Sequence, residues 1–159
     1  MEGAMLAAVA LRLAGKRPLV MDLRSVAHDF DHVVAVFQDD GCFGAISKTN
    51  HGVLRYREPL YKTIRELVMS YFHEYFLDDG QKTLRDYSRL VDLSRFDARG
   101  WMTDEQDLWY IPEYLDSLRH VPILTKKQIR HLRSADPIER QMGKIVEWNR
   151  LSKSKKIPS

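Results

Sequence analysis

The segment HVVAVFQDDGCFGAIS, residues 32 to 47, constrains the fold more than any other part of the sequence. Two runs rich in β-forming residues flank Asp40 and Gly41. Asp-Gly is a dipeptide that accepts the positive φ angles of a two-residue type I′ turn. The segment therefore predicts an antiparallel hairpin that turns at Asp40 and Gly41.

The length of the turn decides which polar residues share a face of this hairpin. With a two-residue turn, facing positions sum to 81, and Ser47 lies on the same face as His32, two residues along. With a three-residue loop the sum is 80, and Asn50 takes the place of Ser47 if the strand extends so far. Both Ser47 and Asn50 are therefore candidate partners of His32.

The region before the hairpin predicts a helix followed by a strand. Residues 4 to 11 are apolar nearly all round, which is typical of a buried helix, and Gly15 ends it. The run is too short for a signal peptide and follows Glu2 instead of a positive charge. No segment approaches the ~20 apolar residues of a membrane span, so no membrane partner is expected. Residues 18 to 23, PLVMDL, predict a buried strand.

The remainder of the chain has mostly helical signals. Residues 59 to 77 repeat apolar side chains at helical spacing, with Pro59 in the first turn. Pro112, Thr125 and Asp136 mark the starts of further helices, and a short strand is expected near residues 90 to 93. The order of elements predicts an α+β fold with a helical C-terminal half.

Composition excludes several classes of protein. The 159 residues suggest one domain, with a net charge of only +3. The clearest basic cluster is three lysines near the C-terminus without an aromatic platform, so we expect no nucleic-acid partner. These lysines are Lys153, Lys155 and Lys156. The single cysteine, Cys42, excludes an internal disulfide and a cysteine-based zinc site, which fits a cytoplasmic protein.

The densest polar cluster is HDFDH, residues 28 to 32, which has the ligand types of a metal site. Histidines four residues apart converge only on a helix, whereas His32 begins a run that favours a strand. We therefore interpret the cluster as a polar turn and expect no metal and no cofactor. His32 itself is either a half-buried histidine bonded to a loop or a functional group.

Taken as a unit, these elements resemble the second half of the transglutaminase-like core. The matching features are a buried helix rich in small residues (EGAMLAAVALRLAG), the strands PLVMDL, DHVVAVF and CFGAIS, and a polar residue about fifteen positions after His32. The longer stretch from residue 31 to residue 76 also looks like an uncharacterised bacterial group of that superfamily. The resemblance implies a core over residues 1 to 58, followed by a helical extension over residues 59 to 159 within a single domain.

The resemblance implies a role for each candidate residue. It places the catalytic histidine of a papain-like Cys-His-Asp triad at His32. The acidic position falls on Ser47, where this sequence departs from the family, and Asn50 could orient the histidine instead. The nucleophilic cysteine of the family would stand one residue before Met1. Cys42 fits neither register as the nucleophile, because it points away from His32 or lies six residues along the strand.

The implied chemistry is acyl transfer or amide hydrolysis through a cysteine thioester. Without the thiol, His32 has no nucleophile to activate, so we expect this chain to be inactive as written, with His32, Ser47 and Asn50 as an incomplete site. The resemblance would make the chain truncated at its start. The alternative is a non-catalytic module that binds a protein or peptide in the retained cleft.

Overall fold

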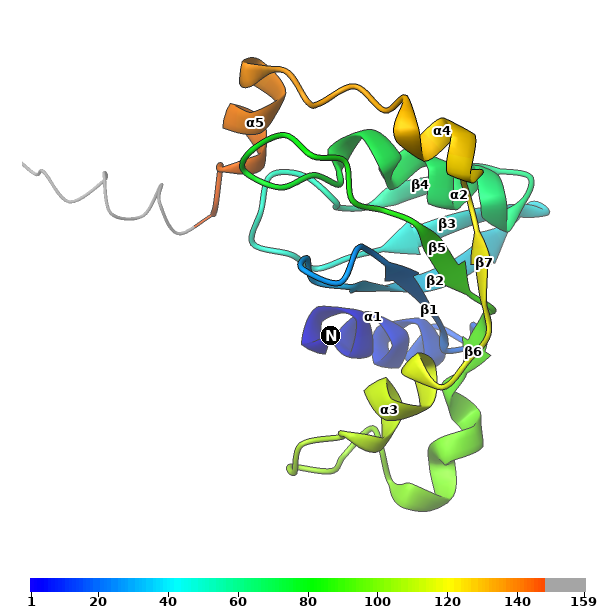
Figure 1. The fold of residues 1–159 in the computed structure, drawn as a ribbon. Helices are drawn as coiled ribbons and strands as arrows, with labels where there is room; N and C mark the ends of the chain where they lie inside the picture. Colours follow the sequence, from blue (N-terminus) through cyan, green and yellow to red (C-terminus); the bar gives the residue numbers. More distant parts are fainter. Residues whose placement is uncertain (148–159) are drawn as a thin grey trace, which may run out of the picture.

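The computed structural model describes residues 1–147 of the chain, so the three C-terminal lysines lie outside the described residues. A seven-stranded antiparallel sheet in the order β4-β3-β2-β1-β5-β7 forms its centre, with β6 also paired to β1 (Figure 1). The strands are β1 (Leu19–Arg24), β2 (His32–Asp39), β3 (Cys42–Ile46), β4 (Arg57–Tyr61), β5 (Asp86–Ser88), β6 (Val91–Asp92) and β7 (His120–Pro122). The predicted α+β fold class is confirmed.

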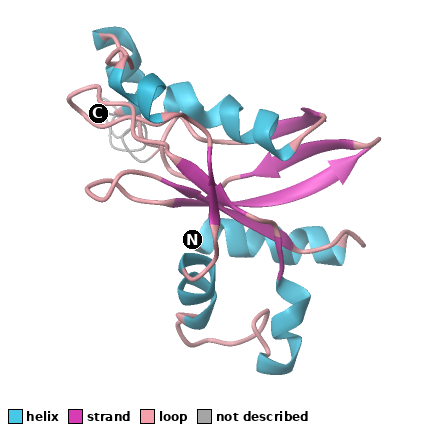
Figure 2. Cartoon of the chain, turned by 45° about the vertical axis from the view of Figure 1, so that its right-hand side comes forward, coloured by secondary structure: helices cyan, strands magenta, loops and turns pink. Residues whose placement is uncertain are grey.

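Helices cover both faces of this sheet, as the two ribbon views show (Figures 1 and 2). The helices are α1 (Glu2–Leu13), α2 (Ile64–Tyr71), α3 (Tyr110–Asp116), α4 (Lys126–Arg130) and α5 (Pro137–Gly143), with 3₁₀ turns at Phe72–Glu74 and Leu93–Arg99. One apolar core joins α1 and α3 to the sheet, and a second joins α2 to the opposite face. Among the described residues, no helix is both long and apolar enough to cross a membrane.

The central hairpin has the two-residue turn that its sequence predicts. Asp39 pairs with Cys42, which gives the register sum of 81, and Asp40 and Gly41 both have positive φ angles, 47° and 76°. Strand β2 is buried on both faces, since Val33 and Ala35 contact the α1 core while Val34 and Val36 contact the α2 core. The hairpin is therefore the centre of the sheet.

Helix α1 follows the expected chain segment but is buried on one side only. Ala4, Ala7, Ala8 and Leu11 pack on the sheet, whereas Leu6 and Leu13 are 68% and 83% exposed. A single layer of sheet covers one stripe of a helix, so the all-round apolar pattern does not mean all-round burial.

The prediction of one helix over residues 59 to 77 is wrong. Residues 59 to 61 belong to the edge strand β4. Helix α2 begins only at Ile64, where Thr63 and Glu66 make a capping box. Edge strands accept proline, so Pro59 did not mark a helix start here. Strands β5, β6 and β7 also belong to the region predicted as a helical extension. The division at residue 58 stays a prediction, and β4 crosses that position.

The helix starts predicted near the C-terminus are confirmed in two cases. Thr125 and Asp136 each form a capping box with the residue three positions on, at the starts of α4 and α5. Neither of these helices has a buried residue, so they contribute little to the core.

Candidate functional site

His32 and Ser47 meet where β2 begins and β3 has just ended. The register of the hairpin puts both on the face toward α2, and a hydrogen bond joins His32 Nε2 to Ser47 Oγ. Ser47 is buried at 6% exposure, and the loop that contains Leu54 lies over the histidine. The structure thus brings together two of the three residues that the sequence analysis proposed for the site.

Burial keeps His32 neutral. Loss of hydration lowers the pKa of His32 to about 4, and the positive charge of the chain's amino terminus adds to this effect, while a hydrogen bond with the backbone of Leu54 opposes it. Nε2 is engaged by Ser47, and the hydrogen bond with the Leu54 backbone also uses the ring. A serine hydroxyl can either donate or accept, so Ser47 orients the ring without dictating its tautomer, unlike a carboxylate.

The start of α1 lies beside this histidine. Met1, Glu2 and Gly3 line a cavity of about 450 Å³ together with His32 and residues 48 to 51. Gly3 makes the approach close: a Cβ there would stand 2.3 Å from the Lys48 carbonyl oxygen, so only glycine lets the helix start at this place. The first residues of α1 and His32 therefore line the same hollow.

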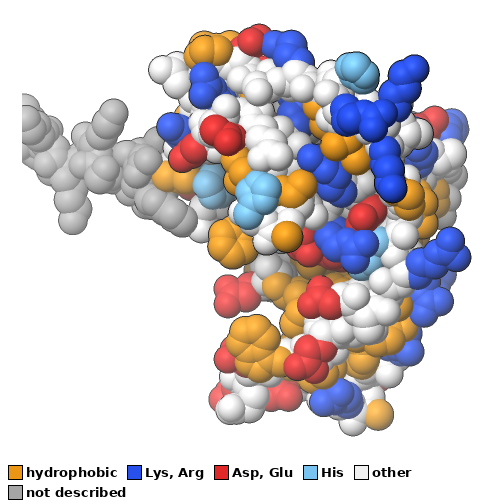
Figure 3. All heavy atoms as spheres, in the orientation of Figure 1, with side chains coloured by type: hydrophobic (Ala, Val, Ile, Leu, Met, Phe, Trp, Pro, Cys, Tyr) orange, Lys and Arg blue, Asp and Glu red, His pale blue; other side chains and the backbone are white. Residues whose placement is uncertain are grey.

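A second cavity, of about 380 Å³, opens on the other side of His32. Its lining includes His51 and the apolar side chains of Val53, Leu54 and Phe76. Phe30 also lines it and is 92% exposed. Figure 3 shows histidine side chains among hydrophobic ones on the face beneath α5.

Asn50 lines the first cavity but does not orient His32. It is exposed, and its backbone carbonyl accepts a hydrogen bond from the Glu147 N–H. Within residues 1–147, no hydrogen bond joins Asn50 to His32, so of the two residues that the sequence left open, Ser47 is the one bonded to His32. Cys42 pairs with Asp39 at the turn, the far end of the hairpin from His32, so it is not a nucleophile for this histidine.

The HDFDH cluster is a polar turn, as expected, with its members bonded to different partners. His28 contacts Gln81, Asp29 accepts from the Thr83 hydroxyl, and Asp31 accepts from the backbone and hydroxyl of Ser25. His32 points to Ser47. The two histidines therefore do not form a common ligand set.

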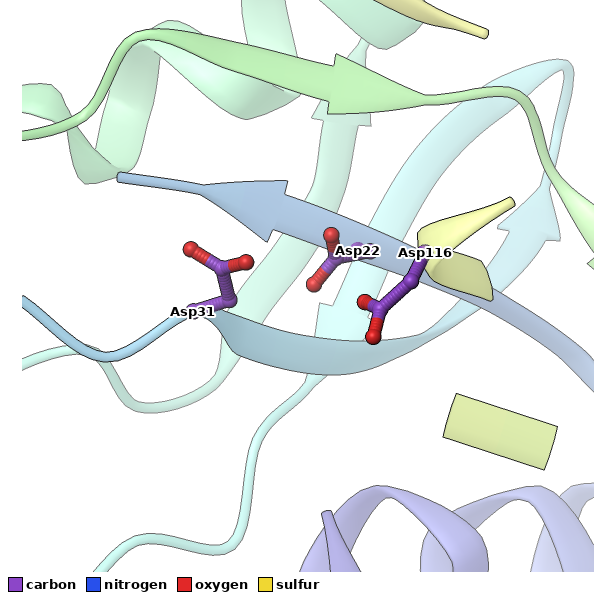
Figure 4. Close-up of side chains that lie close together, drawn as sticks. All are labelled: Asp22, Asp31 and Asp116. Atoms are coloured by element: carbon purple, nitrogen blue, oxygen red, sulfur yellow. The ribbon is translucent and has the colours of Figure 1, made fainter. Parts of the chain in front are cut away.

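The structure reveals a carboxylate cluster that the sequence analysis missed. Carboxylate oxygens of Asp22, Asp31 and Asp116 all lie within 4.8 Å of one another, brought together from β1, the turn before β2 and the end of α3 (Figure 4). Asp22 is buried at 2% exposure. An aspartate inside the apolar strand PLVMDL was the one sequence signal that could have found this cluster, because a buried carboxylate needs a partner.

The partner of Asp22 is His120, at the start of β7. Its Nε2 lies 2.9 Å from Asp22 Oδ2, and its Nδ1–H donates to the Leu118 carbonyl at 2.9 Å. Both ring nitrogens face oxygen acceptors, so the pair must hold a proton between Nε2 and the carboxylate. Burial raises the pKa of Asp22 to about 6, against the hydrogen bond from His120, which lowers it. The pair ties β7 to β1 across the sheet.

Comparison of the chain with protein-family models and with curated protein sequences found no match. The resemblance to the transglutaminase-like core therefore stays a hypothesis that rests on the residues themselves.

The burial of His32 predicts a pH dependence of stability. The unfolded histidine has a pKa of 6.5 and the folded one about 4, so the unfolded chain binds more protons in between, and the folded state loses roughly 3 kcal/mol as the pH falls from 6.5 to 4. In His32→Gln, urea unfolding at pH 7 and pH 4.5 should show a smaller acid loss than in the unmodified chain. His28→Gln, at an exposed position, is the matched control. Equal acid losses in the His32→Gln variant and the unmodified chain would contradict the assignment.

Proposed function

We propose that the chain carries the histidine part of a transglutaminase-like acyl-transfer site, with His32 as the base and Ser47 as its orienting residue. The observation that supports this most is the shared cavity of His32 and the first residues of α1. A thiol at a helix N-terminus is acidified by the helix dipole, and its thiolate would raise the pKa of the His32 imidazole from about 4, so that the ring can take the thiol proton. Such a thiolate attacks an amide carbonyl, forms a thioester and releases an amine. Water or a second amine then releases the acyl group.

The sequence as given has no thiol at the start of α1, so in this proposal the chain has no acyl-transfer activity by itself. Its single cysteine, Cys42, lies at the turn end of the hairpin. In this proposal the protein is cytoplasmic, and its partner is a protein or peptide. The expected substrate group is an amide, because the chemistry of the site is attack on a carbonyl.

The test supplies the thiol. In a Cys42→Ser background, a cysteine is added directly before Met1 in the full chain, and its alkylation by iodoacetamide is followed against pH. If His32 activates it, the thiol should have a pKa well below 8.5 and react at pH 6 at least tenfold faster than in the same chain with His32→Ala. With p-nitrophenyl acetate it should release p-nitrophenolate as the acetyl thioester forms.

Two controls accompany this test. A serine added in place of the cysteine should be inert, and His28→Ala should leave the rate unchanged, because His28 bonds to Gln81 away from the cavity. A thiol that behaves like free cysteine and does not respond to His32→Ala would rule out the proposed function.

A specific observation favours a second candidate, a non-catalytic peptide-binding module. Phe30 is 92% exposed on the lining of the 380 Å³ cavity, where Phe76 and Leu77 add further apolar surface. Exposed aromatic side chains beside apolar cavities are common at sites that hold an apolar side chain of a partner. This function needs no thiol.

A further inference from the structure

Residues 145–147 pair with the loop beside His32 as a short strand would. The Gly52 N–H donates to the Ile145 carbonyl at 2.7 Å, and the Glu147 N–H donates to the Asn50 carbonyl at 2.9 Å. His51 and Val146 face each other in this antiparallel bridge. Residues 50 to 52 thus present a backbone edge that binds an extended segment.

This edge belongs to the cavity of the candidate site. Asn50 and His51 line the 450 Å³ cavity that holds His32 and the start of α1. A second, smaller hollow of about 170 Å³ is lined by Asn50 and Gly52 together with the paired residues Ile145, Val146 and Glu147. An extended segment on the edge therefore lies immediately beside His32.

Charge at the edge selects an acidic side chain. The Glu147 carboxylate lies 3.3 Å from Lys48 Nζ and 4.0 Å from an Arg55 guanidinium nitrogen. These pairs are exposed, so they stabilise the contact weakly, but two cations around one carboxylate set the direction and register of the bound segment.

Residues 145–147 are held lightly by the rest of the protein. Helix α5, just before them, has no buried residue, and Ile145 is 49% exposed. Two further contacts lie nearby: His51 Nδ1–H donates to the Gly143 carbonyl at 3.1 Å, and Gly143 lies close to the Phe76 ring. Because these residues bury little apolar surface, displacing them from the edge costs little free energy.

We propose that the edge at residues 50 to 52 is a peptide-binding site, occupied from within the chain by residues 145–147. The partner is an extended peptide that, like Ile145-Val146-Glu147, has two β-branched residues followed by an acidic one. It binds by strand addition, with its backbone on Asn50 and Gly52 and its carboxylate between Lys48 and Arg55. The internal segment acts as an autoinhibitor. The inference rests on the proposed function in that it names the substrate class for the His32 site.

The test frees the edge by one substitution in the full chain. Glu147→Pro removes both the N–H that bonds Asn50 and the carboxylate that faces Lys48. A fluorescein-labelled peptide, Lys-Ile-Val-Glu-amide, is titrated with each protein and followed by anisotropy. We expect the variant to bind it at least tenfold more tightly than the unmodified chain, where the internal segment competes at high effective concentration. Glu105→Pro, in an exposed loop, should bind like the unmodified chain.

The same titration tests the charge of the partner. Lys-Ile-Val-Lys-amide should bind the Glu147→Pro variant at least tenfold more weakly than the glutamate peptide. A variant that unfolds at the normal temperature and binds neither peptide better than the unmodified chain would overturn the inference, as would equal binding of both peptides.

A second measurement keeps the test decisive if Glu147→Pro does not fold. In the unmodified chain, millimolar glutamate peptide should displace residues 145–147 and accelerate hydrogen exchange at the Glu147 amide, and the lysine peptide should not. Unchanged exchange would overturn the inference. These readouts need no added cysteine, so they can be compared with the earlier thiol test. If the peptides fail these tests but the added thiol is activated by His32, only the peptide site is ruled out. If the glutamate peptide binds as expected but the added thiol is not activated, only the proposed function is ruled out.

Discussion

Replacement of His120 by alanine is expected to lower the free energy of unfolding by about 3 to 5 kcal/mol at pH 8, because it leaves the buried Asp22 carboxylate without its partner. Both side chains are at most 3% exposed, and Asp31 and Asp116 add negative charge close by. Urea unfolding at pH 8 and pH 5 measures the effect. The loss should be smaller at pH 5, because Asp22, whose pKa is already raised to about 6, then takes up a proton.

Asp22→Asn is the matched partner for this experiment. The double variant His120→Ala with Asp22→Asn should be more stable at pH 8 than His120→Ala alone, because the buried charge is gone. An equal loss at both pH values, with no recovery in the double variant, would show that His120 acts through packing and not through the Asp22 carboxylate.

Gly44→Ala is expected to destabilise the central hairpin by about 2 to 3 kcal/mol, close to the upper range for overpacking in a core. A Cβ at Gly44 would stand 2.6 Å from the Phe37 ring and 2.8 Å from the Arg57 carbonyl oxygen. Neither neighbour can yield easily, since Phe37 is in the α1 core and the carbonyl belongs to β4. Thermal unfolding measures the loss.

Gly52→Ala provides the control, because the nearest atom to its Cβ would be 3.5 Å away, an ordinary contact. Its cost should stay below about 0.5 kcal/mol. In Phe37→Leu, the further change Gly44→Ala should cost less than in the unmodified chain, since the smaller side chain leaves space. If Gly44→Ala costs no more than Gly52→Ala, the aromatic ring does not pack on the glycine as described.

The parts of the fold that depend on local chemistry were predictable. The Asp40-Gly41 turn has a strong backbone preference, and it set the register that brings Ser47 to His32. Thr125 and Asp136 cap their helices through side-chain bonds within four residues. The error over residues 59 to 77 has the opposite origin: Pro59 lies in an edge strand because β3 is available to pair with it, which is a contact between distant residues.

For the candidate site too, local features were predictable from the sequence and long-range contacts were not. By itself the sequence determined an α+β fold and a central hairpin, and it narrowed the partner of His32 to Ser47 or Asn50, because turn geometry and strand alternation act over a few residues. Only the tertiary structure decided that the start of α1 shares the His32 cavity, that Asn50 faces Glu147, and that His120 neutralises Asp22 across 98 positions of the chain. Such contacts depend on how the layers pack. Packing brings together residues that are far apart in the chain, and local sequence preferences do not predict these contacts.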